Sequence, residues 1–250
     1  MSSSKTGRAT IALVTGGAGI MGRAAARGLI EDGHRVVLAD INEEAVAAVA
    51  IELGGDTFPV AFDISNFDSC AVAMKRVVAE VGEVQVLVNN AGILSSTKMV
   101  DTTPEEWHRV MSVNLDGAFY MTKLCLPAMR NARWGRIINV SSWAAKCGGL
   151  TAGSAYSVSK AAIIGLTFST AVETTGDGIT VNGIAPAYVR TPMVEKQLTP
   201  EQQKQVMARI PVGRYCEPDE FAHVVKFLAS PKAGFITGEI IDQNGGFQFD

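Results

Sequence analysis

The sequence has little of what several protein classes require. Its four cysteines lie far apart and none belongs to a CxxC pair, so their spacing indicates neither a thiol-redox motif nor a metal motif. The three histidines are scattered over expected helices and turns with no second ligand nearby, and we predict no metal site. No apolar run reaches the roughly 18 residues of a membrane span, and the polar N-terminus does not resemble a signal peptide. We therefore expect a cytoplasmic protein with no membrane partner.

An excess of charge of one sign is also missing. The chain has 22 basic and 25 acidic residues, a formal net charge of −3, and no basic block stands out. A protein that binds nucleic acid through its phosphates needs a concentrated basic surface. We therefore expect no nucleic-acid partner.

What the sequence does contain is an alternation of short apolar runs with amphipathic stretches. The chain of 250 residues is 47% hydrophobic, which is enough for the core of one α/β domain. We predict seven strands at Ile11–Thr15, Arg35–Ala39, Thr57–Ala61, Val86–Val88, Arg136–Val140, Thr180–Ile184 and Glu239–Asp242. Helical patterns lie between them at Gly22–Glu31, Glu43–Leu53 and Phe67–Val81, and later helices are predicted to begin after Thr103, Thr199 and Glu217.

Alternating strands and helices predict a doubly wound parallel sheet of the Rossmann type, with helices on both faces. No linker or repeat divides the chain. We expect a single domain of the Rossmann type over residues 8–250, preceded by a flexible tail at 1–7.

The first strand runs into a glycine-rich loop, TGGAGIMG at 15–22. Glycines at the carboxyl end of a parallel strand allow backbone N–H groups to approach a pyrophosphate, and the following helix N-terminus favours its negative charge. The cofactor-binding candidates in this loop are Gly16, Gly19, Ile20, Met21 and Gly22. The alternative is a tight turn whose glycines serve packing alone.

Asp40 ends the second strand, 18 residues after Gly22. A carboxylate at this place can accept hydrogen bonds from an adenosine ribose, and it would repel a 2′-phosphate. Neither Ile41 nor Asn42 offers a positive charge to hold such a phosphate. The pattern favours NAD over NADP, and the alternative is a solvated acid in a turn.

Tyr156 and Lys160 lie four residues apart in a helical stretch, so both side chains share one helix face. A nearby cation favours the phenolate and lowers the pKa of the phenol, and an oxidised nicotinamide would add a second positive charge. Tyr156 could then exchange a proton with a ketone or alcohol oxygen. Taken alone, a YxxxK spacing is common and usually without function.

Ser142 follows the fifth predicted strand, 14 residues before Tyr156. Its hydroxyl could hold a substrate oxygen beside the phenol, although a serine at a strand end is also an ordinary turn former. Trp143 and Lys146 come next and could face the substrate, whereas packing is an equally good interpretation of Trp143.

Taken together, these segments resemble the classical short-chain dehydrogenase/reductase family over nearly the whole chain. The resemblance rests on TGGAGIMG at 15–22, Asp63-Ile64, NNAG at 89–92, Asn114, Ser142, YSVSK at 156–160, PAYVRTPM at 186–193 and the closing TGEIIDQNGG. It implies the catalytic set Asn114, Ser142, Tyr156 and Lys160.

The resemblance also implies cofactor contacts along the loops. Asp63 and Ile64 would border the adenine, and Asn90, Ala91 and Gly92 would line the cofactor under the nicotinamide ribose.

Nearer the nicotinamide, the resemblance implies that Lys160 binds the ribose and that Asn114 holds a water connecting Lys160 to solvent. Val189 would approach the carboxamide with Thr191 nearby, and a substrate lid would span about 190–210. In this family, helices beside the active site and the C-terminal region form interfaces. A homotetramer is therefore expected, with the terminal residues 247–250 suited to an interface.

Two residues depart from the family pattern. Ile20 stands where the middle glycine of TGxxxGxG is usual, and Ala187 replaces the glycine that usually follows Pro186. These substitutions bear on the conformation of the loop at 15–22 and on the backbone entering the expected lid.

The sequence thus predicts an NAD(H)-dependent oxidoreductase that moves a hydride between nicotinamide and a secondary alcohol or ketone. The stretch AVETTGDG after Lys160 lacks basic residues for docking an acidic carrier protein, which favours a small polyol, sugar or hydroxy-ketone as substrate. The C-terminal third closely resembles 3-oxoacyl thioester reductases, which are the alternative. A nucleotide-sensing regulator on the same fold is a distant third hypothesis, because such proteins often lose the tyrosine or lysine.

Overall fold

A computed structural model describes residues 9–191 and 199–249. Its strands are β1 (Ile11–Thr15), β2 (Arg35–Asp40), β3 (Thr57–Ala61), β4 (Val86–Asn89), β5 (Gly135–Val140), β6 (Ile179–Pro186) and β7 (Ile240–Gln243). Its helices are α1 (Ile20–Glu31), α2 (Glu43–Leu53), α3 (Phe67–Glu80), α4 (Pro104–Met111), α5 (Gly117–Ala132), α6 (Ala144–Cys147), α7 (Ser154–Thr174), α9 (Pro200–Ala208) and α10 (Pro218–Ala229). A π-helical segment, Ser112–Asp116, joins α4 to α5, and short 3₁₀ turns occupy Thr175–Asp177 and Pro231–Ala233.

The strands form one parallel sheet in the order β3-β2-β1-β4-β5-β6-β7. The predicted seven-stranded doubly wound fold is therefore confirmed, and all seven predicted strands are present. Successive strands are added outward from β1 to β3, and the next strand, β4, lies on the other side of β1, so the order of addition reverses there. Such a reversal opens a crevice at the carboxyl ends of β1 and β4, where ligands bind in this class of fold.

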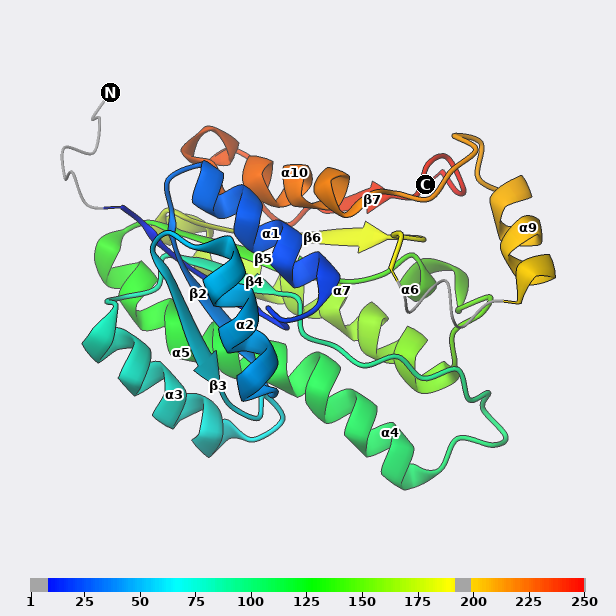
Figure 1. The fold of residues 1–250 in the computed structure, drawn as a ribbon, viewed down its shortest axis with the longest axis horizontal. Coiled ribbons are helices and arrows are strands. Elements are labelled where there is room, and N and C mark those ends of the chain that lie inside the picture. The colour runs from blue at the N-terminus through cyan, green and yellow to red at the C-terminus, as the bar shows by residue number, and fades with distance from the viewer. Residues whose placement is uncertain (1–8, 192–198, 250) are drawn as a thin grey trace.

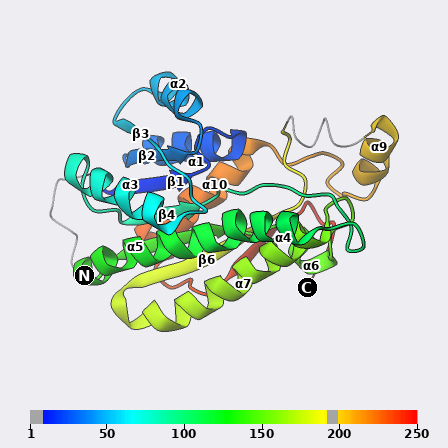
Figure 2. The same ribbon diagram turned by 90° about the horizontal axis from the view of Figure 1, so that it is seen from below.

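Helices cover both faces of the sheet (Figures 1 and 2). One core joins the sheet to α1, α2 and α10, and its fully buried members include Leu29, Leu38 and Phe221. The other core packs α3 and α5 on the opposite face around Leu87, Met121 and related residues. Strands buried on both faces explain why several of them, such as β1 and β4, appear in the sequence as nearly continuous apolar runs.

The predicted helix starts are also confirmed. Thr103 accepts a hydrogen bond from the Glu106 amide at 3.2 Å at the start of α4. Thr199 and Gln202 form a reciprocal capping box at α9, and Glu217 and Glu220 form another at α10.

Two predicted segments fall partly or wholly outside the described residues. The expected tail at 1–7 is one, and residues 192–198 of the expected lid are the other. The described part of the lid region holds α9, which lies at one end of the molecule (Figure 1).

Within the described ranges, one segment, Ser154–Asp177, is long and apolar enough by composition to cross a bilayer. It contains α7, which packs against β6 and β5 and carries buried Ile163, Thr167 and Ala171. These contacts identify it as a core helix of this fold.

The loop after β1 leaves no room for a side chain at Gly22, which can be tested by mutation. A Cβ at this residue would lie 2.2 Å from the Gly16 carbonyl oxygen, a backbone atom that cannot move aside cheaply. We expect Gly22→Ala to lower the melting temperature and to weaken NADH binding about tenfold, because the loop must open to admit the methyl group. Calorimetry and NADH fluorescence titration measure the two effects.

The matched control is Gly176→Ala, since a Cβ at exposed Gly176 meets nothing within 4 Å and its φ is not left-handed. Parental melting temperature and NADH affinity in Gly22→Ala would show that the loop tolerates a side chain there.

Candidate active site

Two cavities meet at the carboxyl ends of the central strands. The first, the Tyr156 pocket, has a volume of about 210 Å³, and its lining includes Ser142, Trp143, Tyr156, Lys160 and Tyr188. The second, the Asp40 pocket, has a volume of about 270 Å³ and lies between the ends of β1, β2 and β4. Gly92 and Ile93 line both, so the two cavities are neighbouring parts of one crevice.

The glycine-rich loop forms the floor between β1 and α1. Gly16 has a φ of +66°, and a Cβ there would lie 2.9 Å from the Ala91 Cα. Gly19 is the N-cap of α1, and Ile20, Met21 and Gly22 form the first turn. The first N–H groups of a helix have no partner within the helix, so this turn offers donors to an anion.

The departure at Ile20 does not disturb this arrangement. Gly19 has an ordinary φ of −75°, α1 begins at Ile20, and the Ile20 side chain is 38% exposed. The Arg23 amide donates to the Gly19 carbonyl oxygen at 2.8 Å, which closes the first turn.

Asp40 lies at the end of β2, as predicted, and faces this loop. Its Oδ2 accepts a hydrogen bond from the Ala18 amide at 3.1 Å, and its Oδ1 accepts one from the Asn42 amide at 3.2 Å. Asp63 and Ile64 line the same pocket. Ser65 donates to the Asp63 carboxylate through both its amide and its hydroxyl.

The segment 89–92 is hydrogen-bonded to the end of β1. The Thr15 hydroxyl oxygen accepts from the Asn90 and Ala91 amides, each at 3.0 Å, and the Asn90 side-chain amide donates to the Thr15 carbonyl at 2.9 Å. Thr15 is thus a structural residue of the site that was not among the predicted site residues, although it begins the TGGAGIMG motif.

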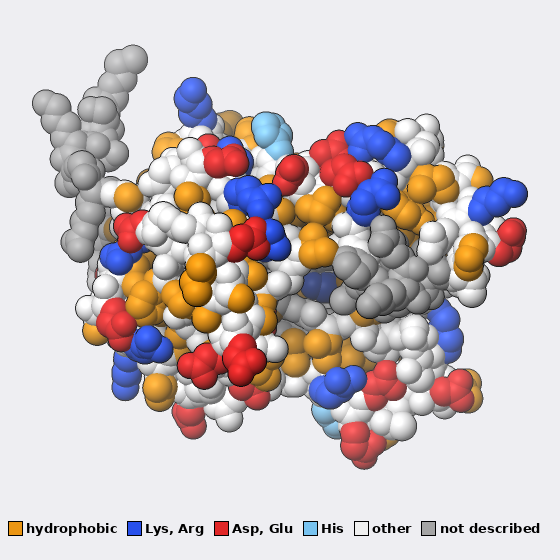
Figure 3. Space-filling model, viewed as in Figure 1, with side chains coloured by type: hydrophobic (Ala, Val, Ile, Leu, Met, Phe, Trp, Pro, Cys, Tyr) orange, Lys and Arg blue, Asp and Glu red, His pale blue; other side chains and the backbone are white. Residues whose placement is uncertain are grey.

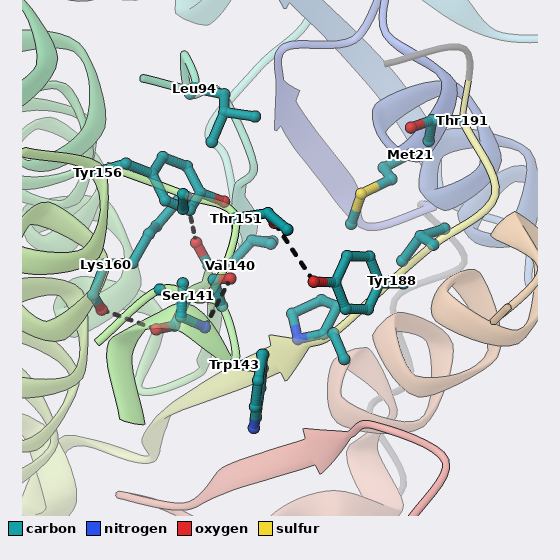
Figure 4. Close-up of a pocket in the computed structure, with 18 of the residues that line it drawn as sticks. Met21, Leu94, Val140, Ser141, Trp143, Thr151, Tyr156, Lys160, Tyr188 and Thr191 are labelled. Atoms are coloured by element: carbon teal, nitrogen blue, oxygen red, sulfur yellow. Dashed lines mark hydrogen bonds between the residues drawn. The ribbon is translucent and has the colours of Figure 1, made fainter. Parts of the chain in front are cut away.

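Lys160 is buried, and its Nζ donates to the Val140 carbonyl oxygen at 2.7 Å. The Ser141 hydroxyl donates to the Lys160 carbonyl at 2.7 Å, which fixes the helix against the end of β5 (Figure 4). Burial lowers the pKa of Lys160 to about 8. A Cβ at residue 92 would lie 3.3 Å from both Lys160 Nζ and Asn114 Oδ1, so glycine leaves these two side chains room to approach the loop.

Asn114 lies in the π-helical segment, beneath the Gly92–Ile93 backbone. Its Oδ1 accepts from the Ile93 amide at 2.8 Å, and its Nδ2 donates to the Ile93 carbonyl and to the Ser159 hydroxyl, each at 3.0 Å. These contacts hold the loop next to Lys160. The water relay expected at Asn114 stays a prediction.

Tyr156 and Ser142 both line the pocket, and Figure 4 shows the Tyr156 hydroxyl directed into it. The Lys160 Nζ lies 5.9 Å from the centre of the Tyr156 ring. Burial raises the pKa of Tyr156, and a hydrogen bond with Ser142 opposes the shift. Lys160 does not contribute to this shift, so the predicted lowering of the Tyr156 pKa is wrong for the protein alone, and the phenol is protonated at neutral pH.

Val189 and Thr191 lie along the same cavity, as does Met21. Four predicted site residues line neither pocket: Gly19, Ile20, Gly22 and Asn114. The first three form the loop and first turn at the start of α1, and Asn114 holds the Ile93 backbone. Trp143 faces the pocket, whereas Lys146 pairs with Asp242 at 2.6 Å.

Tyr188 and Thr151 line the pocket but were not among the predicted site residues. Their hydroxyl oxygens lie 3.3 Å apart across the cavity (Figure 4). Tyr188 belongs to the PAYVRTPM segment, so its place beside Val189 was the available signal.

Comparisons with known proteins agree with this geometry. A family model described as enoyl-(acyl carrier protein) reductase matches residues 16–248. The chain belongs to the classical short-chain dehydrogenase/reductase family. An acetoacetyl-CoA reductase of Shinella zoogloeoides is 39% identical over 94% of this chain and 97% of the relative. A 3-oxoacyl-[acyl-carrier-protein] reductase of Vibrio cholerae is 40% identical over 94% of this chain and 96% of the relative.

A solved member of the family superposes on the whole fold. This structure, from Agrobacterium tumefaciens and described as a "putative gluconate dehydrogenase", is 32% identical, covers 95% of each chain and gives a TM-score of 0.91. The chain is therefore an oxidoreductase of this family that acts on CH–OH groups with a nicotinamide cofactor.

The buried ammonium of Lys160 predicts a specific pH dependence of stability. Its pKa is about 8 in the folded chain against an ordinary value of 10.5, so between these values the unfolded chain binds more protons. Stability contributed by this group therefore rises with pH across that window. We expect Lys160→Met to remove this rise, seen as a smaller gain in melting temperature between pH 8 and 10.5 than in the parent.

Lys75→Met is the control, because exposed Lys75 lies on α3 away from both pockets. The same pH slope in the parent and in Lys160→Met would contradict the buried, shifted ammonium.

Proposed function

We propose that this protein is an NAD(H)-dependent dehydrogenase or reductase of a small, uncharged secondary alcohol or ketone, such as a polyol, sugar or hydroxy-ketone. The single observation that supports the reaction most is the convergence of Ser142, Tyr156 and Lys160 on one cavity that joins the Asp40 pocket. A nicotinamide cofactor bound along this crevice would supply or accept the hydride.

The residues present fit such a cofactor. The first turn of α1 presents N–H donors, and Gly16 and Gly22 leave room that a Cβ would fill. The ring-side residues Asn90, Val189 and Thr191 lie along the adjoining cavity. We propose that the predicted set holds the pyrophosphate, ribose and carboxamide in that order along the crevice.

In this proposal Tyr156 handles the proton. A phenol whose pKa burial has raised is a proton donor at neutral pH, which suits reduction of a ketone oxygen held by Ser142. The positive charge of Lys160 stabilises the phenolate that remains, and in the reverse direction it favours removal of the alcohol proton. The oxygen of the substrate thus lies between two hydroxyl groups, and Lys160 acts from behind the phenol.

The preference for NAD rests on the charges of the Asp40 pocket. Among its described lining residues are two carboxylates, Asp40 and Asp63, and no lysine or arginine. The nearest α1 arginines, Arg23 and Arg27, both pair with Glu52 of α2. A 2′-phosphate would enter a negatively charged pocket without a counter-charge, whereas a ribose diol would find acceptors.

The small, neutral substrate is supported by the lining of the Tyr156 pocket. Lys160 is the one charged residue in its described lining, and hydroxyl groups from Ser142, Thr151 and Tyr188 face it. Lys146, the next cation along the chain from Ser142, pairs with Asp242. Such a cavity suits hydroxyl and carbonyl groups better than a carboxylate or phosphate.

A 3-oxoacyl thioester is the second candidate substrate, favoured by the names of the relatives and by the apolar lining residues Leu94 and Leu150. Against an acidic carrier protein, Arg130 and Arg133 lie beside the end of α7 but share the carboxylate of Asp177. The proposal favours an enzyme over the nucleotide-sensing alternative, because Ser142, Tyr156 and Lys160 line one cavity and the Asn114 side chain binds the backbone of Ile93 beside them.

The homotetramer and the cytoplasmic location stay predictions. Phe119 of α5 and Phe168 of α7 are exposed aromatic side chains, which supports an interface that includes these two helices.

The face shown in Figure 3 has interspersed acidic and basic side chains, and its described residues form no basic patch.

Turnover tests the reaction and the substrate class. We expect the parent to reduce acetoin with NADH and to act on acetoacetyl-CoA less efficiently, measured as kcat/KM from the absorbance of the cofactor. Tyr156→Phe should lower kcat at least a thousandfold, as expected for loss of a general acid together with correct positioning, while NADH binds as in the parent.

Tyr120→Phe is the control, because it removes the same hydroxyl from a ring that packs against Phe67, away from the pocket. Near-parental kcat in Tyr156→Phe would refute the role of the phenol, and preference for acetoacetyl-CoA would select the thioester candidate.

Asp40→Ala tests the cofactor preference. We expect the KM for NADH to rise about tenfold and the preference for NADH over NADPH to fall by at least that factor, because both the ribose acceptor and the repulsive charge are lost. Asp101→Ala, at an exposed loop position, should leave both values unchanged. Equal kcat/KM with the two cofactors in the parent would overturn the assignment to NAD.

A further inference from the structure

The last residues of the chain fold back against the Tyr156 pocket. Phe247 contacts Trp143 edge to face, with ring centroids 4.3 Å apart, and lies 6.1 Å from the Tyr188 ring. Trp143 and Tyr188 line the pocket, whereas Phe247 does not. Phe247 therefore supports the pocket wall from behind, and the expectation that it serves an interface between subunits is not needed to explain it.

A hydrogen bond fixes the same tryptophan. The Trp143 Nε1 donates to the Gln248 Oε1 at 2.8 Å, and the indole is only 6% exposed. Without this acceptor, a buried N–H group would lack its partner or the ring would have to turn. Phe247 and Gln248 together thus determine where the indole plane lies.

The acceptor is itself held in place. The Asn244 side-chain amide donates to the Gln248 carbonyl at 2.8 Å, and the Phe247 amide donates to the Asn244 carbonyl at 3.1 Å. Gly245 has a φ of +61°, and a Cβ there would lie 2.9 Å from Ile210, so the turn packs tightly against the segment after α9.

The backbone beside Ser142 is anchored independently of this tail. The Ser141 amide donates to the Ile184 carbonyl and the Trp143 amide to the Pro186 carbonyl, each at 2.8 Å. Loss of the tail contacts should therefore release the indole ring while the Ser142 hydroxyl stays on the end of β5.

We propose that Phe247 and Gln248 are positioning residues that set substrate specificity by fixing Trp143 as a wall of the Tyr156 pocket. The inference rests on the proposed function, because specificity here means the fit of a substrate beside Tyr156. Trp143 would contact the part of the substrate remote from the reacting carbon. Such a contact changes binding of the substrate and of the transition state alike.

The test compares Gln248→Ala and Phe247→Ala with the parent, using acetoin and acetoacetyl-CoA as probes with NADH. We expect the KM for acetoin to rise about tenfold and kcat to stay within about twofold, with the discrimination between the two probes reduced. NADH affinity should not change. Gln248→Glu keeps an oxygen acceptor for the indole and should restore near-parental KM. Phe249→Ala is the matched control, since this neighbour is 86% exposed.

A second measurement follows the indole itself. In ¹⁵N-labelled protein, with the Trp143 signal assigned through Trp143→Phe, we expect slow hydrogen exchange of the Nε1 proton in the parent, Gln248→Glu and Phe249→Ala. Exchange should be fast in Gln248→Ala. Unchanged exchange there would overturn the inference.

The kinetic outcomes separate the two proposals. A parent that reduces neither probe overturns the proposed function and this inference with it. A parent that turns over while Gln248→Ala and Phe247→Ala keep the parental KM overturns the inference alone.

Discussion

The burial of one ammonium group constrains the whole site. Lys160 Nζ lies against the Val140 carbonyl at 2.7 Å in a place where burial alone disfavours its charge. A group of this kind persists only where surrounding backbone is rigid and suitably oriented. The end of β5 supplies the acceptor, Ser141 holds the turn of α7 that carries the lysine, and glycine at residue 92 leaves the space.

This constraint explains the irregular elements nearby. The π-helical segment carries Asn114, whose side-chain amide makes a two-point contact with the Ile93 backbone. A regular helix would place this side chain differently, so the extra residue in the turn serves to support the Gly92–Ile93 loop. Because that loop lines both cavities, the same support positions the Asp40 pocket relative to the Tyr156 pocket.

Much of the fold could be predicted from the sequence because its information is local. Strands buried on both faces show as apolar runs, and the cap residues Thr103 and Thr199 show where helices begin. The glycine-rich loop, Asp40, Ser142 and the Tyr156–Lys160 pair were also predictable, since they lie at strand ends or on one helix face, and their chemistry depends on neighbours within a few residues. Asn114 and the remaining cofactor-binding candidates were predicted only through the resemblance to the family.

What could not be predicted depends on distant parts of the chain. Gln248 and Trp143 lie 105 residues apart, and nothing in either segment indicates that they meet. The direction of the Tyr156 pKa shift was missed because burial is a property of the assembled cavity, whereas the Lys160 spacing is visible in the sequence. Likewise Arg136 is buried over the Trp134 ring, whereas Arg130 and Arg133, its near neighbours in the sequence, are exposed.

These long-range contacts divide the site into two parts that differ in how far their residues can be substituted. The groups proposed to handle the proton, Tyr156 and Lys160, lie on α7, which buried contacts of Lys160 with Ser141 and Val140 hold against the end of β5. The pocket wall depends on Trp143, Tyr188 and the chain terminus, which pack in a separate aromatic cluster with Val206 and Ile210. Substitutions in that cluster can reshape the cavity while the Lys160–Val140 contact stays intact. A fold built in this way can keep its catalytic core while its substrates vary, which is consistent with thioester reductases at 39–40% identity and a "putative gluconate dehydrogenase" at 32% identity both matching nearly the whole of this chain.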